Sequence, residues 1–299
     1  MAEPTFAFVR SSRLWLIILV VGAAVWLLSA LVVALTKDTI LVPTLLIVGS
    51  FFVPLAMVAF AISRAREGGL TGDALALGFL GGGTIGLICA ALTEVELLPT
   101  VIGTFLAVGL IEETAKGIVL VAVAHGVRSR GPRDGMVLGA TVGAGFAAFE
   151  STGYALQAMI DTAKDREVVN IVGTEAGRAL LAPFGHILWT ALLGGALFAS
   201  ASGTGAFRLT WRVVGTFAGI VALHAAWDAS YGWSIVAADG LVGSGWHLDW
   251  PDTAAWAGTP TGSDLVAFDA AYCVLIALNA VLGTAWAVHR YRAGAPARV

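Results

Sequence analysis

The chain has 299 residues, of which 58% are hydrophobic and only 12% are charged. A soluble globular domain carries about 25% charged residues, so this composition excludes an ordinary soluble protein and predicts a polytopic, all-α membrane protein. The net charge of -3 and the lack of a basic patch argue against nucleic acid as a partner.

Apolar runs of 18 or more residues predict about eight membrane-spanning helices, because about 20 helical residues cross the hydrocarbon core. We expect them at residues 14–35, 41–62, 73–93, 97–124, 134–160, 179–201, 211–233 and 266–289. The first run is too long for a signal peptide and is expected to be a retained span. Pro43 and Pro54 favour a kink in the second span, and Gly81-Gly82-Gly83 argues against a straight third helix.

Lysine and arginine counts predict the orientation of the chain in the membrane. One side collects twelve, namely Arg10, Arg13, Arg64, Arg66, Arg128, Arg130, Arg133, Arg208, Arg212, Arg290, Arg292 and Arg298. The other side collects four, namely Lys37, Lys164, Arg166 and Arg178. This asymmetry predicts that both termini lie in the cytoplasm.

The pattern predicts one integral membrane domain over residues 1–299, in the plasma membrane of a prokaryote. Residues 1–96 form three spans, 97–233 a four-helix core, 234–265 an outer loop, and 266–299 the last span and tail. Residues 161–178 are expected to form a second outer loop with mixed charges. Cys89 and Cys273 fall inside apolar runs without a CxxC spacing, so we expect them to be packing residues.

Three charged residues interrupt the fourth predicted span: Glu112, Glu113 and Lys116. A charge at the bilayer centre costs about 2.5–3.5 kcal/mol on insertion scales, so such residues indicate a functional site with partners on other helices.

Candidate partners lie in the next three spans. Phe146 and Glu150 are four residues apart and share a helix face, as do His224 and Asp228. His186 is the ionisable residue of the sixth span. Glycines at 135, 139 and 143 form a small-residue face that lets a neighbouring helix approach closely.

These residues are expected at one depth in the membrane. At 1.5 Å per helical residue, the distances to the outer span ends are about 12–21 Å, from the outer half to the midplane. The remaining histidines, His125, His247 and His289, fall at span ends or in the outer loop and are not expected to join the site.

Buried negative charge must be neutralised by protons or by a cation. A divalent metal, most simply zinc, would fit histidine and carboxylate ligands and would activate a water molecule. Two alternatives stay open from the residues alone: a metal-free site in which a glutamate and a histidine share a proton, and a proton or ion site of a transporter or binding scaffold.

The ordered set Glu112-Glu113-x-x-Lys116, Phe146-x-x-x-Glu150, His186 and His224-x-x-x-Asp228 resembles the PrsW family of intramembrane metalloproteases, within the superfamily of CAAX prenyl proteases and Abi proteins. The motifs cover the fourth to seventh spans. The resemblance implies hydrolysis of a peptide bond in a membrane-anchored protein, such as an anti-sigma factor, near the extracytoplasmic side.

The resemblance also implies residue roles. Glu112 would be the base that activates water, with Glu113 and Lys116 orienting or balancing it. Glu150, His186 and His224 would hold a metal or position the water, and Asp228 would orient His224 or donate when protonated. CAAX prenyl proteases typically have histidine at the position of Glu150 and arginine at that of Gly117, which argues against a prenylated substrate. Ser151 replaces the asparagine frequent in PrsW-like sequences.

Overall fold

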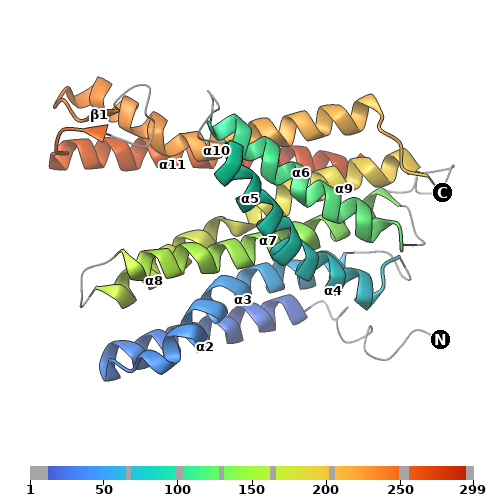
Figure 1. Ribbon diagram of the computed structural model, residues 1–299, viewed down its shortest axis with the longest axis horizontal. Helices are drawn as coiled ribbons and strands as arrows, with labels where there is room; N and C mark the ends of the chain where they lie inside the picture. Colours follow the sequence, from blue (N-terminus) through green and yellow to red (C-terminus); the bar gives the residue numbers. More distant parts are fainter. Residues whose placement is uncertain are drawn as a thin grey trace.

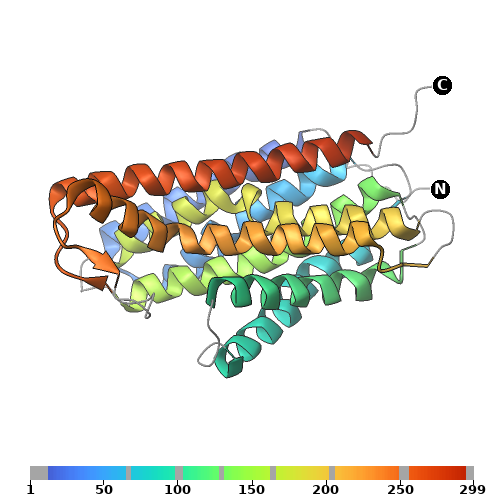
Figure 2. The same ribbon diagram turned by 90° about the horizontal axis from the view of Figure 1, so that it is seen from above.

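The computed structural model describes residues 13–64, 69–97, 104–127, 131–161, 166–201, 206–248 and 256–293. Its elements are α2 (Leu14–Thr36), η1 (Thr39–Leu41), α3 (Val42–Ser63), α4 (Gly72–Gly81), η2 (Gly82–Gly86), α5 (Leu87–Leu97), α6 (Thr104–Ala124), α7 (Pro132–Ile160), α8 (Glu167–Leu181), η4 (Ala182–Phe184), α9 (His186–Ala201), α10 (Trp211–Val242), β1 (His247–Leu248), β2 (Trp256–Ala257) and α11 (Gly262–Ala293). The helices run mostly along the long axis, and α2 begins at the end of the molecule where α11 finishes (Figures 1 and 2).

Six segments of the described chain are long and apolar enough to cross a membrane: Leu14–Thr36, Thr39–Ser63, Gly72–Leu97, Glu167–Ala201, Trp211–Val242 and Gly262–Ala293. The other two predicted spans correspond to α6 and α7. Helix α6 carries the three charged residues of the candidate site, and α7 is rich in glycine and alanine. The all-helical prediction is confirmed, apart from a two-stranded antiparallel pairing of β1 with β2.

Two of the spanning segments are interrupted. The third contains a π-helical turn, η2, at the glycine cluster, in agreement with the expectation of a non-straight helix. The segment Glu167–Ala201, which contains the sixth predicted span, is broken between α8 and α9 by η4 and Gly185. This second break was not predicted, and it puts His186 at the first residue of a helix.

The expectation of an outer loop over residues 161–178 is wrong for most of its length, because α8 begins at Glu167. Its charges suggested a loop, but Glu175 and Arg178 lie on faces of α8 that contact other helices. Glu175 is buried, and its carboxylate accepts a 2.6 Å hydrogen bond from the indole nitrogen of Trp26 in α2. Residues 162–165 of this predicted loop lie outside the described residues.

The predicted outer loop over residues 234–265 is also shorter than expected. Helix α10 continues to Val242, and α11 begins at Gly262. The polar residues Ser230 and Ser234 stay in the helix because their hydroxyls donate to carbonyls four residues earlier, at 2.7 and 2.6 Å. Trp246 is buried against Phe268, with ring centroids 5.8 Å apart, and anchors the remaining loop. Residues 249–255 lie outside the described part.

Helix α7 is the central element, packed against α3, α4, α8 and α9. Its predicted glycine face is confirmed as the contact with α9. A Cβ added to Gly139 would clash with the carbonyl oxygen of Thr190, and one on Gly143 with that of His186. The absence of side chains lets the two backbones touch. This contact fixes the position of His186 relative to α7.

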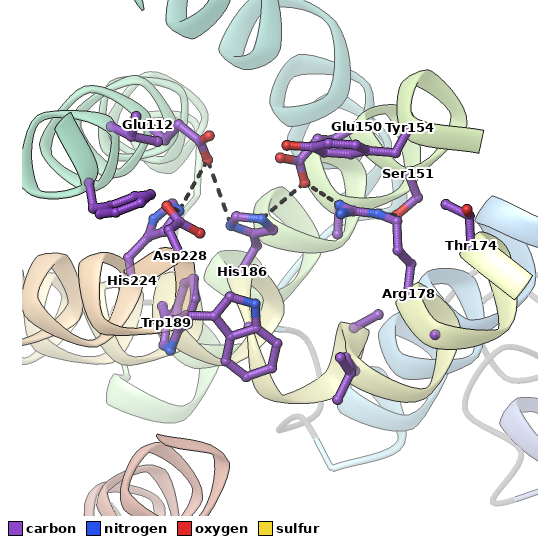
Figure 3. A pocket seen from close by; sticks show the side chains of 18 of the residues that line it. Glu112, Glu150, Ser151, Tyr154, Thr174, Arg178, His186, Trp189, His224 and Asp228 are labelled. Carbon is purple, nitrogen blue, oxygen red and sulfur yellow. Dashed lines mark hydrogen bonds and ion pairs between the residues drawn. The ribbon is translucent and has the colours of Figure 1, made fainter. Parts of the chain in front are cut away.

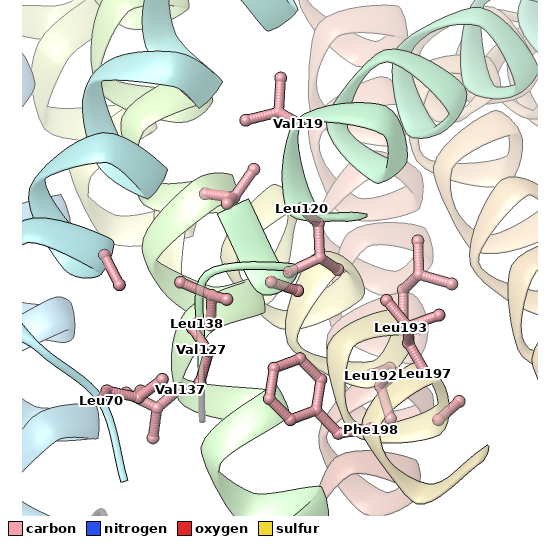
Figure 4. Close-up of a cluster of buried hydrophobic side chains, with 14 of the residues drawn as sticks. Leu70, Val119, Leu120, Val127, Val137, Leu138, Leu192, Leu193, Leu197 and Phe198 are labelled. Atoms are coloured by element: carbon pink, nitrogen blue, oxygen red, sulfur yellow. The ribbon is translucent and has the colours of Figure 1, made fainter. Parts of the chain in front are cut away.

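Below the polar cluster, an apolar core joins α6, α7 and α9 (Figure 4). Leu120, Leu138 and Phe198 are fully enclosed at its centre. The core lies between the candidate site and Ala124, the last residue of α6. It therefore holds that end of α6, α7 and α9 in a fixed arrangement.

Replacing Gly139 with leucine is expected to destabilise the protein, because the new side chain would force α7 away from Thr190. Overpacking of this kind typically costs about 1–3 kcal/mol and sometimes more. Gly153 lies on the same helix, and a Cβ added there would have no atom within 4 Å, so Gly153→Leu is the matched control. Thermal unfolding in detergent should show a lower midpoint for the first variant only. Equal midpoints would contradict the tight α7–α9 contact.

Candidate active site

Four helices bring the predicted polar residues into one cluster (Figure 3). They contribute Glu112, Glu113 and Lys116 from α6, Glu150 from α7, His186 from α9, and His224 and Asp228 from α10. The residues that the sequence predicted at one depth are thus in direct contact, as the following distances show.

The close approach of α6 and α10 depends on Gly109, one turn before the two glutamates. A Cβ at this position would lie 3.1 Å from the carbonyl oxygen of Val221 and 3.4 Å from the Cβ of His224. A larger side chain would push α10 outward. The short separation lets His224 reach Glu113.

Lys116 occupies the centre of the cluster and is fully buried. Its Nζ lies 2.7 Å from Oε1 of Glu113 and 3.2 Å from Oε2 of Glu112. It also lies 4.2 Å from the ring centroid of Phe146, a cation–π distance. The ammonium group therefore compensates the two adjacent carboxylates, which would otherwise be prohibitive inside the membrane.

The hydrogen bonds assign the tautomers of both histidines. Lys116 donates to Nδ1 of His186 at 2.8 Å, so the proton of that ring is on Nε2, which lies 3.1 Å from Oε2 of Glu150. His224 places Nδ1 3.0 Å from Oε1 of Glu113, so Nδ1 carries the proton there. Each ring donates to a carboxylate on one side and keeps a lone pair on the other.

Nε2 of His224, whose lone pair is free, faces the carboxylate of Glu112, and so does Nδ1 of His186, which accepts from Lys116. Oε2 of Glu112 lies 3.9 Å from Nδ1 of His186 and 3.7 Å from Nε2 of His224. One ligand atom from each of these three residues lies within 4.8 Å of the others, an arrangement that can hold a metal ion. Carboxylates on the far ring nitrogens are the usual support of metal-binding histidines. The donor set fits a divalent metal such as zinc.

Trp189 forms a wall beside both imidazoles. Its ring stacks on His224 with centroids 4.7 Å apart, and meets His186 edge-on at 5.4 Å. Because Trp189 is itself buried, it restricts the rotation of both rings. The site is therefore held rigid by packing as well as by hydrogen bonds.

Glu150 lies outside the group of three possible ligands. Its Oε2 contacts the far nitrogen of His186 and forms a 2.5 Å ion pair with Arg178. Arg178 also donates to the hydroxyl of Ser151 at 2.7 Å, and its guanidinium lies 4.3 Å from the ring centroid of Tyr154. Asp228 lies on the other side, with Oδ2 3.4 Å from Nε2 of His224.

Sequence reasoning missed Arg178, Tyr154 and Glu94 as members of the site. Arg178 was counted among the cations of an outer loop. Only a prediction of helix α8 would have indicated that this side chain faces the other helices. Glu94 comes one residue after the third predicted span and lines a pocket together with Glu112 and His186. The Ser151 hydroxyl, noted only as a departure from a family pattern, holds Arg178 in place.

Replacing Arg178 with alanine is expected to lower activity about tenfold without unfolding the protein, the lower end of the effect that is typical when the hydrogen-bonded support of a metal-binding histidine is disturbed. The reason is that Glu150 would lose the cation that fixes it against His186. Arg178→Lys should restore part of the activity through its charge. Hydrolysis rates of the two variants, with thermal midpoints as the control for folding, test this. Wild-type rates in the alanine variant would contradict it.

A pocket of about 680 Å³ opens above the cluster. Glu112, Glu150, His186, His224 and Asp228 form its polar part. Further lining residues come from α5, α6, α7, α8, α10 and α11: Glu94, Thr104, Phe105, Val108, Tyr154, Gly173, Thr174, Trp227 and Tyr272. Glu113 and Lys116 do not line it. A molecule in the pocket can therefore contact the carboxylate of Glu112 but not that of Glu113.

Comparison with known families gives one match over most of the chain: the family described as PrsW family intramembrane metalloprotease matches residues 11–247. The matched range includes every residue of the cluster. No curated protein and no solved structure matches the chain.

Proposed function

Because the chain belongs to the PrsW family of intramembrane metalloproteases, and is thus a multi-pass membrane hydrolase, we propose that it cleaves a membrane-anchored protein, such as an anti-sigma factor, within or near the bilayer. The observation that carries this proposal is the convergence of Glu112, His186 and His224 at the floor of a large pocket.

Glu112 acts as the base. Two observations favour it over its neighbour: Glu112 lines the pocket, whereas Glu113 is fully buried between Lys116 and His224. The carboxylate takes a proton from water as the water oxygen bonds to the peptide carbonyl carbon. The proton then passes to the amide nitrogen as the carbon–nitrogen bond breaks, so that a carboxylic acid and an amine leave.

His224 and Glu112 would hold a divalent metal, and His186 would join them once its Nδ1 no longer accepts from Lys116. A metal held there would polarise the peptide carbonyl and lower the pKa of bound water. Glu150 and Glu113 orient the two rings as hydrogen-bond acceptors. The sequence resemblance implied that Glu150 is a metal ligand, but its contact with the far nitrogen of His186 favours a positioning role.

Asp228 lies at the rim of the pocket next to His224 and limits the movement of that ring. The pocket is on the part of the bundle away from the start of α2 and the end of α11. With the termini in the cytoplasm, as the lysine and arginine distribution predicts, the reaction takes place in the extracytoplasmic half of the membrane.

The proposal is tested with purified protein in detergent or liposomes and a tagged single-span substrate. His186→Ala and His224→Ala are expected to remove both cleavage and bound metal, measured by elemental analysis, whereas Tyr231→Phe on an exposed part of α10 should keep both. Cleavage by the wild type after complete metal removal would overturn the metal site. Cleavage at wild-type rates by both histidine variants would overturn the whole assignment.

A further inference from the structure

A second cavity, of about 340 Å³, lies between α3, α7, α9 and α11, on the opposite side of α9 from the proposed active site. Its floor and walls are apolar along most of their length. They are formed mainly by Met57, Phe60, Met136, Ile187, Leu188 and Val288. Val288 is 41% exposed, so the groove opens toward the lipid-facing surface of the bundle.

Three arginines from three different helices line one end of this groove: Arg64 of α3, Arg133 of α7 and Arg292 of α11. Arg133 is fixed by Tyr291, whose carbonyl oxygen accepts from its Nε at 3.2 Å and whose ring lies 4.1 Å from its guanidinium carbon. The guanidinium of Arg64 lies 5.0 Å from the ring of Phe60. The positive end of the groove is therefore partly preorganised.

Within the described residues, no carboxylate forms an ion pair with any of these three arginines. Three cations at one end of an apolar groove are complementary to an amphiphile with an anionic head. Basic pockets between membrane helices bind anionic lipid head groups by the same chemistry.

We propose that this groove binds an anionic phospholipid, with its phosphate on Arg64, Arg133 and Arg292 and an acyl chain along α7 and α9. The dimensions agree with this occupant. From Arg292 to Thr284, the groove follows eight residues of α11, or about 12 Å. This length is close to the roughly 15 Å hydrocarbon depth of one leaflet, and too short for a helix that crosses the membrane.

The end of the groove away from the three arginines lies at the break between α8 and α9. Pro183 of η4 and Ile187 of α9 line it, and they flank His186 on the other side of the backbone. A bound acyl chain would therefore fill the space behind His186, one of the proposed active-site residues. A free phosphate would contact only the arginine end and would leave this apolar part uncovered.

The test is native mass spectrometry of the purified full-length protein with equal amounts of dioleoyl phosphatidylglycerol and dioleoyl phosphatidylcholine. We expect the wild type to retain the anionic lipid preferentially. The variant with Arg64, Arg133 and Arg292 changed to alanine should lose this preference, by roughly fivefold for each arginine removed. The matched control changes Arg13, Arg208 and Arg212, three exposed arginines outside the groove, and should keep the preference.

A second variant, Val288→Trp, blocks the exposed edge of the groove and leaves every charge in place. It should lower retention of phosphatidylglycerol, whereas inorganic phosphate added in excess should not displace the lipid from the wild type. The proposal is overturned if the wild type retains both lipids equally, or if the control variant loses as much of the preference for phosphatidylglycerol as the groove variant. It is also overturned if free phosphate or a co-purified peptide displaces the lipid.

Discussion

Glu112→Gln is expected to abolish peptide hydrolysis while the protein stays folded and keeps its metal. The glutamine amide can still contribute an oxygen beside His186 and His224, but it cannot take a proton from water. Loss of a general base typically lowers the rate about 10²–10⁴-fold. The measurement is the cleavage rate of a single-span substrate, with metal content determined on the same preparation.

Comparing Glu113→Gln with Glu112→Gln tests which of the two glutamates is the general base. Glu113 is fully enclosed, 2.7 Å from Lys116 and 3.0 Å from His224, so its loss should alter stability and the orientation of His224. We expect partial activity in this variant and none in Glu112→Gln. The reverse order of activities would transfer the role of base to Glu113.

Lys116→Met is expected to be among the most destabilising single substitutions in the chain. The side chain is fully buried, and its ammonium group contacts both Glu112 and Glu113. Removing one partner of a buried ion pair typically costs about 3–5 kcal/mol, because a charge is left without compensation. A marked drop in the thermal midpoint, together with loss of cleavage, is the expected result.

Adding Glu113→Gln to Lys116→Met should recover much of the stability, because the pair is then removed as a whole. The double variant is still expected to be inactive, since Lys116 no longer holds Glu112 and His186 in position. Thermal midpoints of the two single variants and the double variant form a complete cycle. Additive losses of stability would show that Lys116 and Glu113 do not act as a pair.

The sequence was sufficient to predict that the ionisable residues of α6, α7, α9 and α10 meet. Buried ionisable residues are rare in membrane helices, and four-residue spacing put Glu150 and Phe146, and His224 and Asp228, on common faces. Alternating helix directions then brought them to one depth. The glycine face of α7 was also readable, because small residues at this spacing have few other uses inside a membrane.

The pairing within the cluster could not be predicted. That Glu150 supports the far nitrogen of His186 depends on ring orientation, which the backbone break at Gly185 determines. Arg178 was misassigned because charges on α8 were taken as evidence of a loop. Its helix is stable there only because Ile171 and Glu175 pack against other helices. The spacing of Ile171, Glu175 and Arg178 at i, i+4 and i+7 is helical, but two of these three residues are charged, so no apolar stripe marked the buried face.

The break between α8 and α9 has an electrostatic consequence. Since α9 begins at His186, its macrodipole starts inside the membrane, with the equivalent of about half a positive charge near that residue. In a medium of low dielectric constant this field acts over a longer range than in water. It favours negative charge on Glu112 and Glu150, and it would favour negative charge developing on a carbonyl oxygen next to His186. If α8 and α9 formed one continuous helix, the same side chains would be present, but no helix N-terminus would lie beside His186 to produce this field.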